Sequence, residues 1–178
     1  MYPFTIREIA EHLGKSMTHH GPITNIILDS RQAVPGSLFF ALPGANFDGH
    51  QFVPDVLAAG GYAVVKYGSI AAPSDRVIEV EDPLSALQQL AKAHLNQMQV
   101  PVVAVTGSNG KTTTKDLIAA VLGSKFIVHK TQGNFNNEIG LPLTILNLEQ
   151  NHQVVVLEMG MRGSGHIAAL TNIAPPDV

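Results

Sequence analysis

The chain has 178 residues, of which 45% are hydrophobic and 14% charged, a composition typical of a folded protein of one or two domains. Its net charge of -3 offers no basic surface for a phosphate backbone, so we expect no nucleic acid partner. The lack of cysteine excludes disulfides and thiol chemistry. No signal-peptide pattern or membrane-length apolar run is present, so we expect a cytoplasmic protein without membrane insertion. The sequence does not indicate an oligomeric state.

The first part of the chain alternates short helices and strands. Residues 5–8 have the capping-box pattern, before a short amphipathic helix that we expect to end at Gly14. Strands are expected at residues 23–28, 37–42, 62–66 and 76–80, and a helix at residues 52–59. These elements predict a small mixed sheet with helices, which closes near residue 81.

Polar residues of this first part gather in loops. Asp29, Ser30 and Arg31 follow the first strand, and taken alone they could form a simple polar turn. The second strand is followed by a loop that contains Asn46, Asp48, Gly49 and His50. An earlier loop carries His19 and His20, a weak metal candidate because adjacent side chains rarely converge without further ligands.

A proline marks the predicted domain boundary. Asp82 and Pro83 are typical of a helix N-cap and first helical residue, and leucines keep helical spacing up to Gln97. We therefore expect domains at residues 1–81 and 82–178. Beyond this helix, strands are expected at residues 102–105, 125–129 and 153–157, with a helix from 111 to 122. This alternation predicts an α/β domain with a parallel sheet and helices on both faces.

The stretch VVAVTGSNGKTTT, residues 102–114, predicts a strand, a tight loop and the start of a helix. Loop amides and the positive end of the helix dipole together suit a phosphate group. Lys111 adds a charge for the outer phosphates, and the Thr112 hydroxyl is placed to join the coordination of Mg²⁺. Because Val105 stands where the general motif has glycine, the match is to a shorter Gly-x-x-Gly-Lys-Thr variant. The alternative is a glycine-rich turn with a solvated lysine, but the flanking elements favour a nucleoside triphosphate site.

Two further polar motifs follow. Asn134, Asn136 and Asn137 are too many asparagines for a simple turn, and their side chains suit a loop shaped around a polar ligand. The last predicted strand ends at Glu158, and an acidic residue at the carboxyl end of a buried parallel strand is the usual second contact to Mg²⁺ beside a phosphate loop. The alternative is a glutamate that is merely exposed at the strand tip.

Together, GSNGKTT (107–113), GNFNNEIG (133–140) and EMG (158–160) resemble the ATP-dependent Mur ligase family, and DSR (29–31) and DGH (48–50) fit its first domain. The asparagine-rich stretch is similar to members that add D-alanyl-D-alanine to UDP-N-acetylmuramoyl-tripeptide. The resemblance implies a ligase of peptidoglycan synthesis with ATP and Mg²⁺ as cofactors. ATP would phosphorylate the carboxylate of the tripeptide, and the amine of the dipeptide would attack the acyl phosphate.

The resemblance also implies a role for each motif. The residues implied near the reacting centre are Lys111, Asn136, Asn137 and Glu158. Those implied to bind the nucleotide are Gly107, Ser108, Asn109, Gly110, Lys111, Thr112 and Thr113. The implied metal ligands are Thr112 and Glu158. The implied contacts to the UDP-sugar are Ser30, Arg31, Asn46, Asp48, Gly49 and His50.

Family members continue with further strands, a histidine and a modified lysine for a second metal, and a third domain. The resemblance therefore implies a fragment with a complete first domain and an incomplete ATPase domain, inactive by itself. We expect His166 to be capping or solvated rather than that histidine. Two alternatives are a non-catalytic module that binds a nucleotide or UDP-sugar, and another phosphate-loop transferase such as a small kinase, against which residues 134–140 argue.

Overall fold

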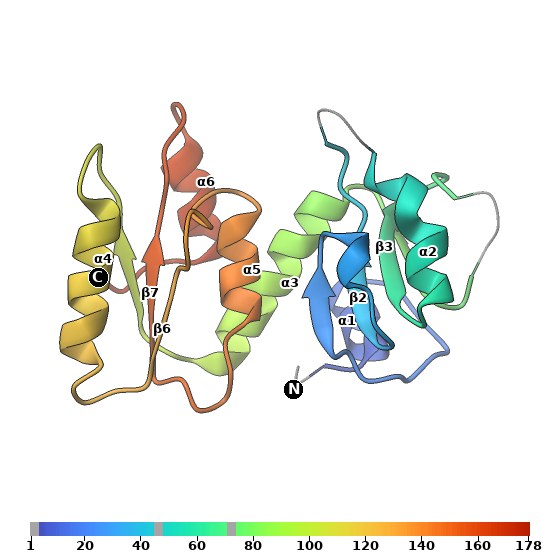
Figure 1. Ribbon diagram of the computed structural model, residues 1–178, viewed down its shortest axis with the longest axis horizontal. Helices are drawn as coiled ribbons and strands as arrows, with labels where there is room; N and C mark the ends of the chain where they lie inside the picture. Colours follow the sequence, from blue (N-terminus) through green and yellow to red (C-terminus); the bar gives the residue numbers. More distant parts are fainter. Residues whose placement is uncertain (1–3, 45–47, 71–73) are drawn as a thin grey trace. The chain divides into compact units, whose positions relative to one another are not determined.

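The computed structural model describes residues 4–44, 48–70 and 74–178, which form two compact units (Figure 1). Unit 1 is Met1–Leu90 and unit 2 is Ala91–Val178, and each contains one parallel sheet. The division falls within helix α3, Pro83–Met98. The domain boundary at residue 82 stays a prediction. Within the three described ranges, no helix is both long and apolar enough to cross a bilayer.

The sheet of unit 1 has the order β1-β2-β3-β4, with every neighbouring pair parallel. The strands are β1 Asn25–Ile27, β2 Ser37–Phe40, β3 Tyr62–Lys66 and β4 Val77–Val80. The sequence predicts a mixed sheet, and this was wrong. A 3-10 turn, η1 (Ser30–Gln32), interrupts the connection from β1 to β2, and η2 (Gly49–Phe52) with α2 (Val53–Ala58) returns the chain from β2 to β3. Each strand therefore starts at the same edge of the sheet.

Both faces of this sheet are buried. Phe39 and Val65 pack with Val53 and Val56 of α2 on one face. Phe40 points to the opposite face, because side chains alternate along a strand, and it is fully buried as well. Helix α1, Ile6–His12, begins with the predicted capping box, and the amides of Leu84 and Ser85 at the start of α3 donate to the carboxylate of Asp82. The caps predicted from the sequence are thus confirmed.

Unit 2 has a sheet of order β5-β7-β6, again parallel throughout. The strands are β5 Val102–Val105, β6 Val128–Lys130 and β7 Val154–Glu158, and the helices are α4 Lys111–Leu122, α5 Gly140–Leu146 and α6 His166–Ile173. Helix α4 covers one face of the sheet, where Ala119 packs against Val105 and Val156. Since parallel strands end at the same edge, the middle strand β7 ends between the segments that leave β5 and β6. This arrangement positions the candidate site.

Two elements of unit 2 differ from the prediction. Strand β6 begins at Val128 rather than 125, because the amides of Ser124 and Lys125 still bond to the end of α4 in a turn. Helix α5 was not predicted, since its segment contains Gly140 and Pro142, which usually oppose helix. The proline lies in the first turn, where its missing N–H costs no hydrogen bond. Gly140 lies directly against the main chain of Phe135, where a side chain would not fit.

Candidate functional site

The segment between β5 and α4 forms the predicted tight loop. Gly107 has φ +146° and Gly110 has φ +76°, which are backbone conformations that favour glycine. The Thr106 hydroxyl donates to the Met159 carbonyl at 3.0 Å and ties the loop to the residue after β7. The Lys111 ammonium donates to the Gly107 carbonyl at 2.7 Å, so it folds back over the loop. Ser108, Asn109 and their neighbours in the loop are exposed, and Thr113 lies in the first turn of the helix that follows.

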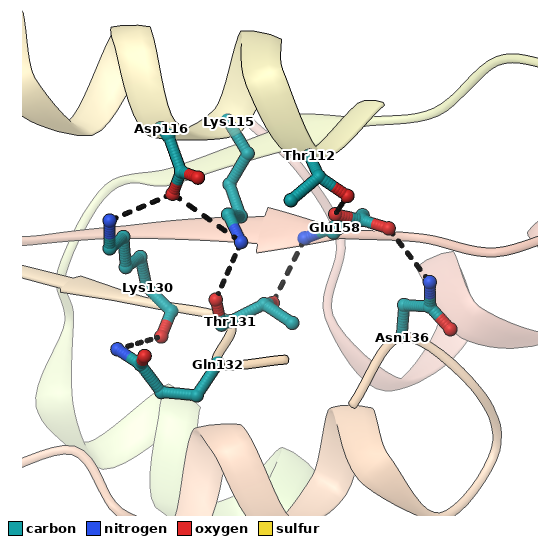
Figure 2. A network of polar contacts seen from close by, with 8 residues as sticks. All are labelled: Thr112, Lys115, Asp116, Lys130, Thr131, Gln132, Asn136 and Glu158. Atoms are coloured by element: carbon teal, nitrogen blue, oxygen red, sulfur yellow. Dashed lines mark hydrogen bonds and ion pairs between the residues drawn. The ribbon is translucent and has the colours of Figure 1, made fainter. Parts of the chain in front are cut away.

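Glu158 is the centre of the polar network at the end of β7 (Figure 2). Its side chain is almost completely buried, with 3% of the residue exposed, which rules out a glutamate that is merely exposed at a strand tip. The Thr112 hydroxyl donates to one carboxylate oxygen at 2.9 Å, and the Asn136 amide donates to the other at 2.8 Å. The structure therefore brings together one residue from each of the three motifs predicted from the sequence.

Glycines of the second and third motifs allow this convergence. A Cβ on Gly160 would lie 2.9 Å from the Asn136 side-chain oxygen, and the Gly160 N–H donates to the Asn136 carbonyl at 2.7 Å. A Cβ on Gly140 would lie 2.4 Å from the Cα of Phe135. Any larger residue at either position would push the loop that carries Asn136 away from the end of β7. The spacing of glycines in these motifs thus has a steric cause.

Asn137 has a different environment from Asn136. Its side-chain oxygen accepts from the amides of Ile139 and Gly140, at 3.2 and 2.8 Å. These bonds shape the turn that leads into α5, as asparagine side chains commonly do. The structure thus brings Asn136 to the Glu158 carboxylate and engages Asn137 in local backbone contacts. A role for Asn137 at the reacting centre stays a prediction.

Two buried residues of the network were not predicted. Lys115 is 3% exposed and Thr131 is fully buried. The Lys115 ammonium donates to the Thr131 carbonyl at 2.9 Å, and the Thr131 hydroxyl accepts from the Glu158 N–H at 3.0 Å. One signal could have found Lys115, because it lies at helical spacing from Ile118 and Ala119 on the apolar face of α4. Thr131 carries no such signal.

In unit 1, the first predicted loop forms an ion pair. Asp29 caps η1 through the Arg31 N–H, and the Arg31 guanidinium donates to both carboxylate oxygens at 2.6 to 3.1 Å. These hydrogen bonds lower the pKa of Asp29 to about 2. The Arg31 side chain is 87% exposed, so it remains accessible to a ligand. Ser30 is the first residue of the same 3-10 turn.

The second predicted loop is held by Asp48, Gly49 and His50. The two nitrogens of the His50 ring are both engaged: Nδ1 lies 2.5 Å from the Asp48 carboxylate, and Nε2 accepts from the Lys66 N–H at 3.0 Å. The N–H and ring of His50 lower the pKa of Asp48. A Cβ on Gly49 would lie 2.7 Å from the Leu42 carbonyl. Gly49 and His50 thus fix the chain at the start of η2, and Asn46 lies outside the described residues.

The remaining histidine candidates have local partners. Nε2 of His20 lies 3.0 Å from the Arg7 guanidinium, and the His19 ring packs edge-on against Tyr62. No group of three or more His, Cys, Asp or Glu side chains in the described parts of the chain could hold a metal ion. Nδ1 of His166 accepts from the Arg162 N–H at 3.2 Å in the loop before α6, and the residue is exposed and caps no helix, so of the two roles expected for it, it has the solvated one rather than the capping one.

The residues at the end of β7 nevertheless fit a magnesium ion bound together with a nucleotide. Mg²⁺ takes oxygen ligands and is usually held by one or two carboxylates, with phosphates and water completing its shell. Glu158 supplies a carboxylate and Thr112 a hydroxyl, both next to the first turn of α4. A cluster of three acidic or histidine side chains is not required for this kind of site.

A parallel sheet with a buried glutamate at the end of its middle strand, beside a Gly-x-x-Gly-Lys-Thr loop, defines a phosphate-loop α/β protein. Comparison with protein families then gives the particular family. The model of the Mur ligase middle domain matches residues 105–178, and that of the Mur ligase family, catalytic domain, matches residues 22–95. The chain belongs to the Mur ligase family.

Individual relatives agree with this assignment. The chain is 47% identical, over 97% of its length, to UDP-N-acetylmuramoyl-tripeptide--D-alanyl-D-alanine ligase of Bacillus subtilis, and 46% identical over 98% to the Synechocystis enzyme of that name. It spans 39% and 40% of those two proteins.

Two solved structures are similar to the chain in fold. Crystal structure I of MurF from Acinetobacter baumannii matches 98% of this chain with a TM-score of 0.87 and 33% identity, and the chain covers 39% of it. MurF ligase from Thermotoga maritima in complex with ADP matches 86% of the chain with a TM-score of 0.80 and 42% identity, and the chain covers 36% of it.

Proposed function

We propose that this chain forms the UDP-sugar-binding and phosphate-binding portions of a ligase that joins D-alanyl-D-alanine to UDP-N-acetylmuramoyl-tripeptide in peptidoglycan synthesis. The convergence of Thr112, Asn136 and Glu158 at one strand end carries the proposal. The names of the Bacillus and Synechocystis relatives support the choice of substrates. Because the chain spans about 40% of these relatives, the complete reaction is proposed for a longer protein.

In this proposal, the loop from Gly107 to Thr113 holds the phosphates of ATP. Phosphoryl transfer requires positioning and charge neutralisation more than covalent chemistry. The amides at the start of α4 and the Lys111 ammonium supply fixed positive charge for this purpose. Thr112 and Glu158 would hold Mg²⁺, which when bound neutralises charge on the phosphate oxygens. Transfer of the γ-phosphoryl group to the tripeptide carboxylate releases ADP and gives an acyl phosphate. The amine of D-alanyl-D-alanine then attacks the acyl carbon, which forms the peptide bond and releases phosphate.

The sugar nucleotide is assigned to the loops after β1 and β2 of unit 1. These strands are parallel neighbours, so both loops leave from the same edge of the sheet. The exposed guanidinium of Arg31 has the fork geometry that suits a diphosphate, with Ser30 beside it. His50 contributes by fixing its loop, because both ring nitrogens already have partners.

The phosphate-loop part of the proposal is tested by calorimetric titration of the chain with ADP and Mg²⁺. Lys111→Ala should weaken binding about tenfold or more, because a hydrogen bond to a charged group contributes ~1.5–3 kcal/mol. Lys125→Ala is the matched control, since Lys125 is an exposed lysine beyond the end of α4. Equal affinities of wild type and Lys111→Ala would contradict the phosphate-loop assignment.

The UDP-sugar part is tested by titration with UDP-N-acetylmuramoyl-tripeptide. Calorimetry is the suitable method because the chain has no tryptophan. Arg31→Ala should weaken this ligand and leave ADP affinity unchanged. Arg7→Ala is the control, since Arg7 is an exposed arginine of α1 paired with Glu11. Loss of both ligands in Arg31→Ala would contradict two separate sites.

A further inference from the structure

The hydrogen-bond ladder between β6 and β7 changes its acceptor at Thr131. The Thr131 N–H donates to the Val156 carbonyl at 3.0 Å, as regular parallel pairing requires. In that pattern, the Glu158 N–H would next donate to the main-chain carbonyl of Thr131. It donates instead to the Thr131 hydroxyl, at 3.0 Å. The side chain thus replaces the main chain as the acceptor, and the carbonyl is released from the ladder.

Lys115 donates a hydrogen bond to the released carbonyl. Its ammonium lies 2.9 Å from the Thr131 oxygen and 3.5 Å from the Asp116 carboxylate. A buried ammonium is costly unless its donors are satisfied, so these two oxygens offset part of the cost of burying it. The helix α4 therefore holds the Thr131 carbonyl outside the sheet.

This change of acceptor lies where the chain leaves β6 and enters the loop that carries Asn134, Asn136 and Asn137. Figure 2 shows Lys115 on α4, Thr131 where the chain leaves β6 and Glu158 on β7. Thr131 holds the main chain of Glu158, while Asn136, five residues further along the same loop, holds its carboxylate. Both contacts depend on the direction in which the chain leaves the sheet at Thr131. Lys115 fixes that direction through the Thr131 carbonyl, and among the described residues no hydrogen bond joins it to Glu158.

We propose that Lys115 is a positioning residue of the magnesium–nucleotide site, and that it acts through Thr131 on the position of Glu158 relative to Thr112. Lys115 lies one helical turn after Lys111, so α4 presents one ammonium to the phosphate loop and a second one to the strand end. The inference rests on the proposed function, in which Thr112 and Glu158 are the metal ligands.

The test compares ADP affinity with and without Mg²⁺, measured by calorimetry on the whole chain. Lys115→Met keeps the length of the side chain and removes the ammonium. ADP affinity without Mg²⁺ should stay unchanged, because the phosphate loop is intact. The gain in affinity on adding Mg²⁺ should fall about tenfold or more, as is typical when a partner of a metal ligand is removed.

Lys130→Met is the matched control. Lys130 bonds to the same Asp116 carboxylate, at 2.8 Å, but its ammonium is not bonded to the Thr131 carbonyl. This variant should keep the wild-type Mg²⁺ gain. A merely structural role of Lys115 would lower the melting temperature without changing the ratio of the two ADP affinities, and that outcome would overturn the proposal.

A second pair of variants decides the matter if Lys115→Met does not fold. Thr131→Ser retains the hydroxyl and should keep the Mg²⁺ gain, whereas Thr131→Val removes it and should reduce the gain about tenfold. An equal gain in ADP affinity on adding Mg²⁺ in these two variants would overturn the proposal that Lys115 acts on Glu158 through Thr131. If wild type itself gains nothing from Mg²⁺, the proposed function fails, and this result is distinguishable because it appears before any substitution.

Discussion

At the scale of single residues, two neighbouring asparagines have separate tasks. Asn136 donates to the Glu158 carboxylate, and Asn137 accepts from the amides that precede α5. Asn137→Ala should lower the free energy of unfolding by about 1 kcal/mol, the usual net value of a lost hydrogen bond. The Mg²⁺ gain in ADP affinity should remain. Urea denaturation and calorimetry measure the two quantities.

Asn136→Ala, unlike Asn137→Ala, should reduce the gain in ADP affinity on adding Mg²⁺. Without its amide, one oxygen of the buried Glu158 carboxylate loses its donor and the carboxylate is free to turn away from Thr112. The Mg²⁺ gain should then fall, again about tenfold. If Asn137→Ala reduced the Mg²⁺ gain as strongly as Asn136→Ala does, the division of tasks between them would be wrong.

The sequence indicates the side chains that meet at the candidate site better than the residues that hold them through main-chain contacts. Thr112 and Glu158 stand at a helix start and a strand end that the sequence pattern places near each other, and the family resemblance implied Asn136 beside them. The structure brings the three side chains together, and their roles stay predictions. Lys115 and Thr131 act through a main-chain carbonyl and a main-chain amide. Such contacts leave little trace in residue type, because any strand can present a carbonyl. For the same reason, the role of His50 in holding the Lys66 amide could not be predicted.

At the scale of elements, the predictions were most reliable where a cap or a glycine fixes a boundary. The capping box of α1, Asp82 before α3 and the end of α4 at Leu122, just before a glycine, all lie where the sequence predicts them. Helix α5 was missed because glycine and proline usually oppose helix. Here Gly140 makes room for Phe135, and Pro142 lies in the first turn, where it is compatible with helix. The parallel direction of β1 to β4 depends on how connections cross the sheet, which short strand patterns do not encode.

The cap of α3 gives a prediction at this scale. The Asp82 carboxylate accepts from the amides of Leu84 and Ser85, at 3.2 and 3.1 Å, and from the Ser85 hydroxyl at 2.5 Å. Asp82→Ala should lower the free energy of unfolding by about 1 kcal/mol, as typical N-cap replacements do. Asp82→Asn keeps an acceptor oxygen and should recover most of the loss. Urea denaturation at neutral pH measures both, and an equal loss in the two variants would show that the carboxylate charge, rather than the cap, is what stabilises the helix.

At the scale of the whole molecule, two imidazoles of unit 2 donate to main-chain carbonyls and have lowered pKa values. His94 and His129 donate through Nε2 to the carbonyls of Leu148 and Thr144, at 3.1 and 2.8 Å. Burial lowers the pKa of both below the ordinary value of 6.5, against the opposing effect of these carbonyls. For His129, the nearby His152 lowers the pKa further and Glu149 raises it. The fold therefore favours the neutral form of both rings.

This difference in pKa predicts how unit 2 responds to acid. The unfolded chain binds protons on these rings at a higher pH than the folded chain, so the stability they contribute is complete above pH 6.5 and falls as the pH drops toward the lower folded pKa values. Urea denaturation followed residue by residue by NMR should show unit 2 less stable at pH 5 than at pH 7.5. His129→Gln removes one of the two titrating rings and keeps a side-chain donor for the Thr144 carbonyl, so its stability should depend less on pH than that of wild type. A variant with the full wild-type pH dependence would show that the imidazole of His129 does not link protonation to folding.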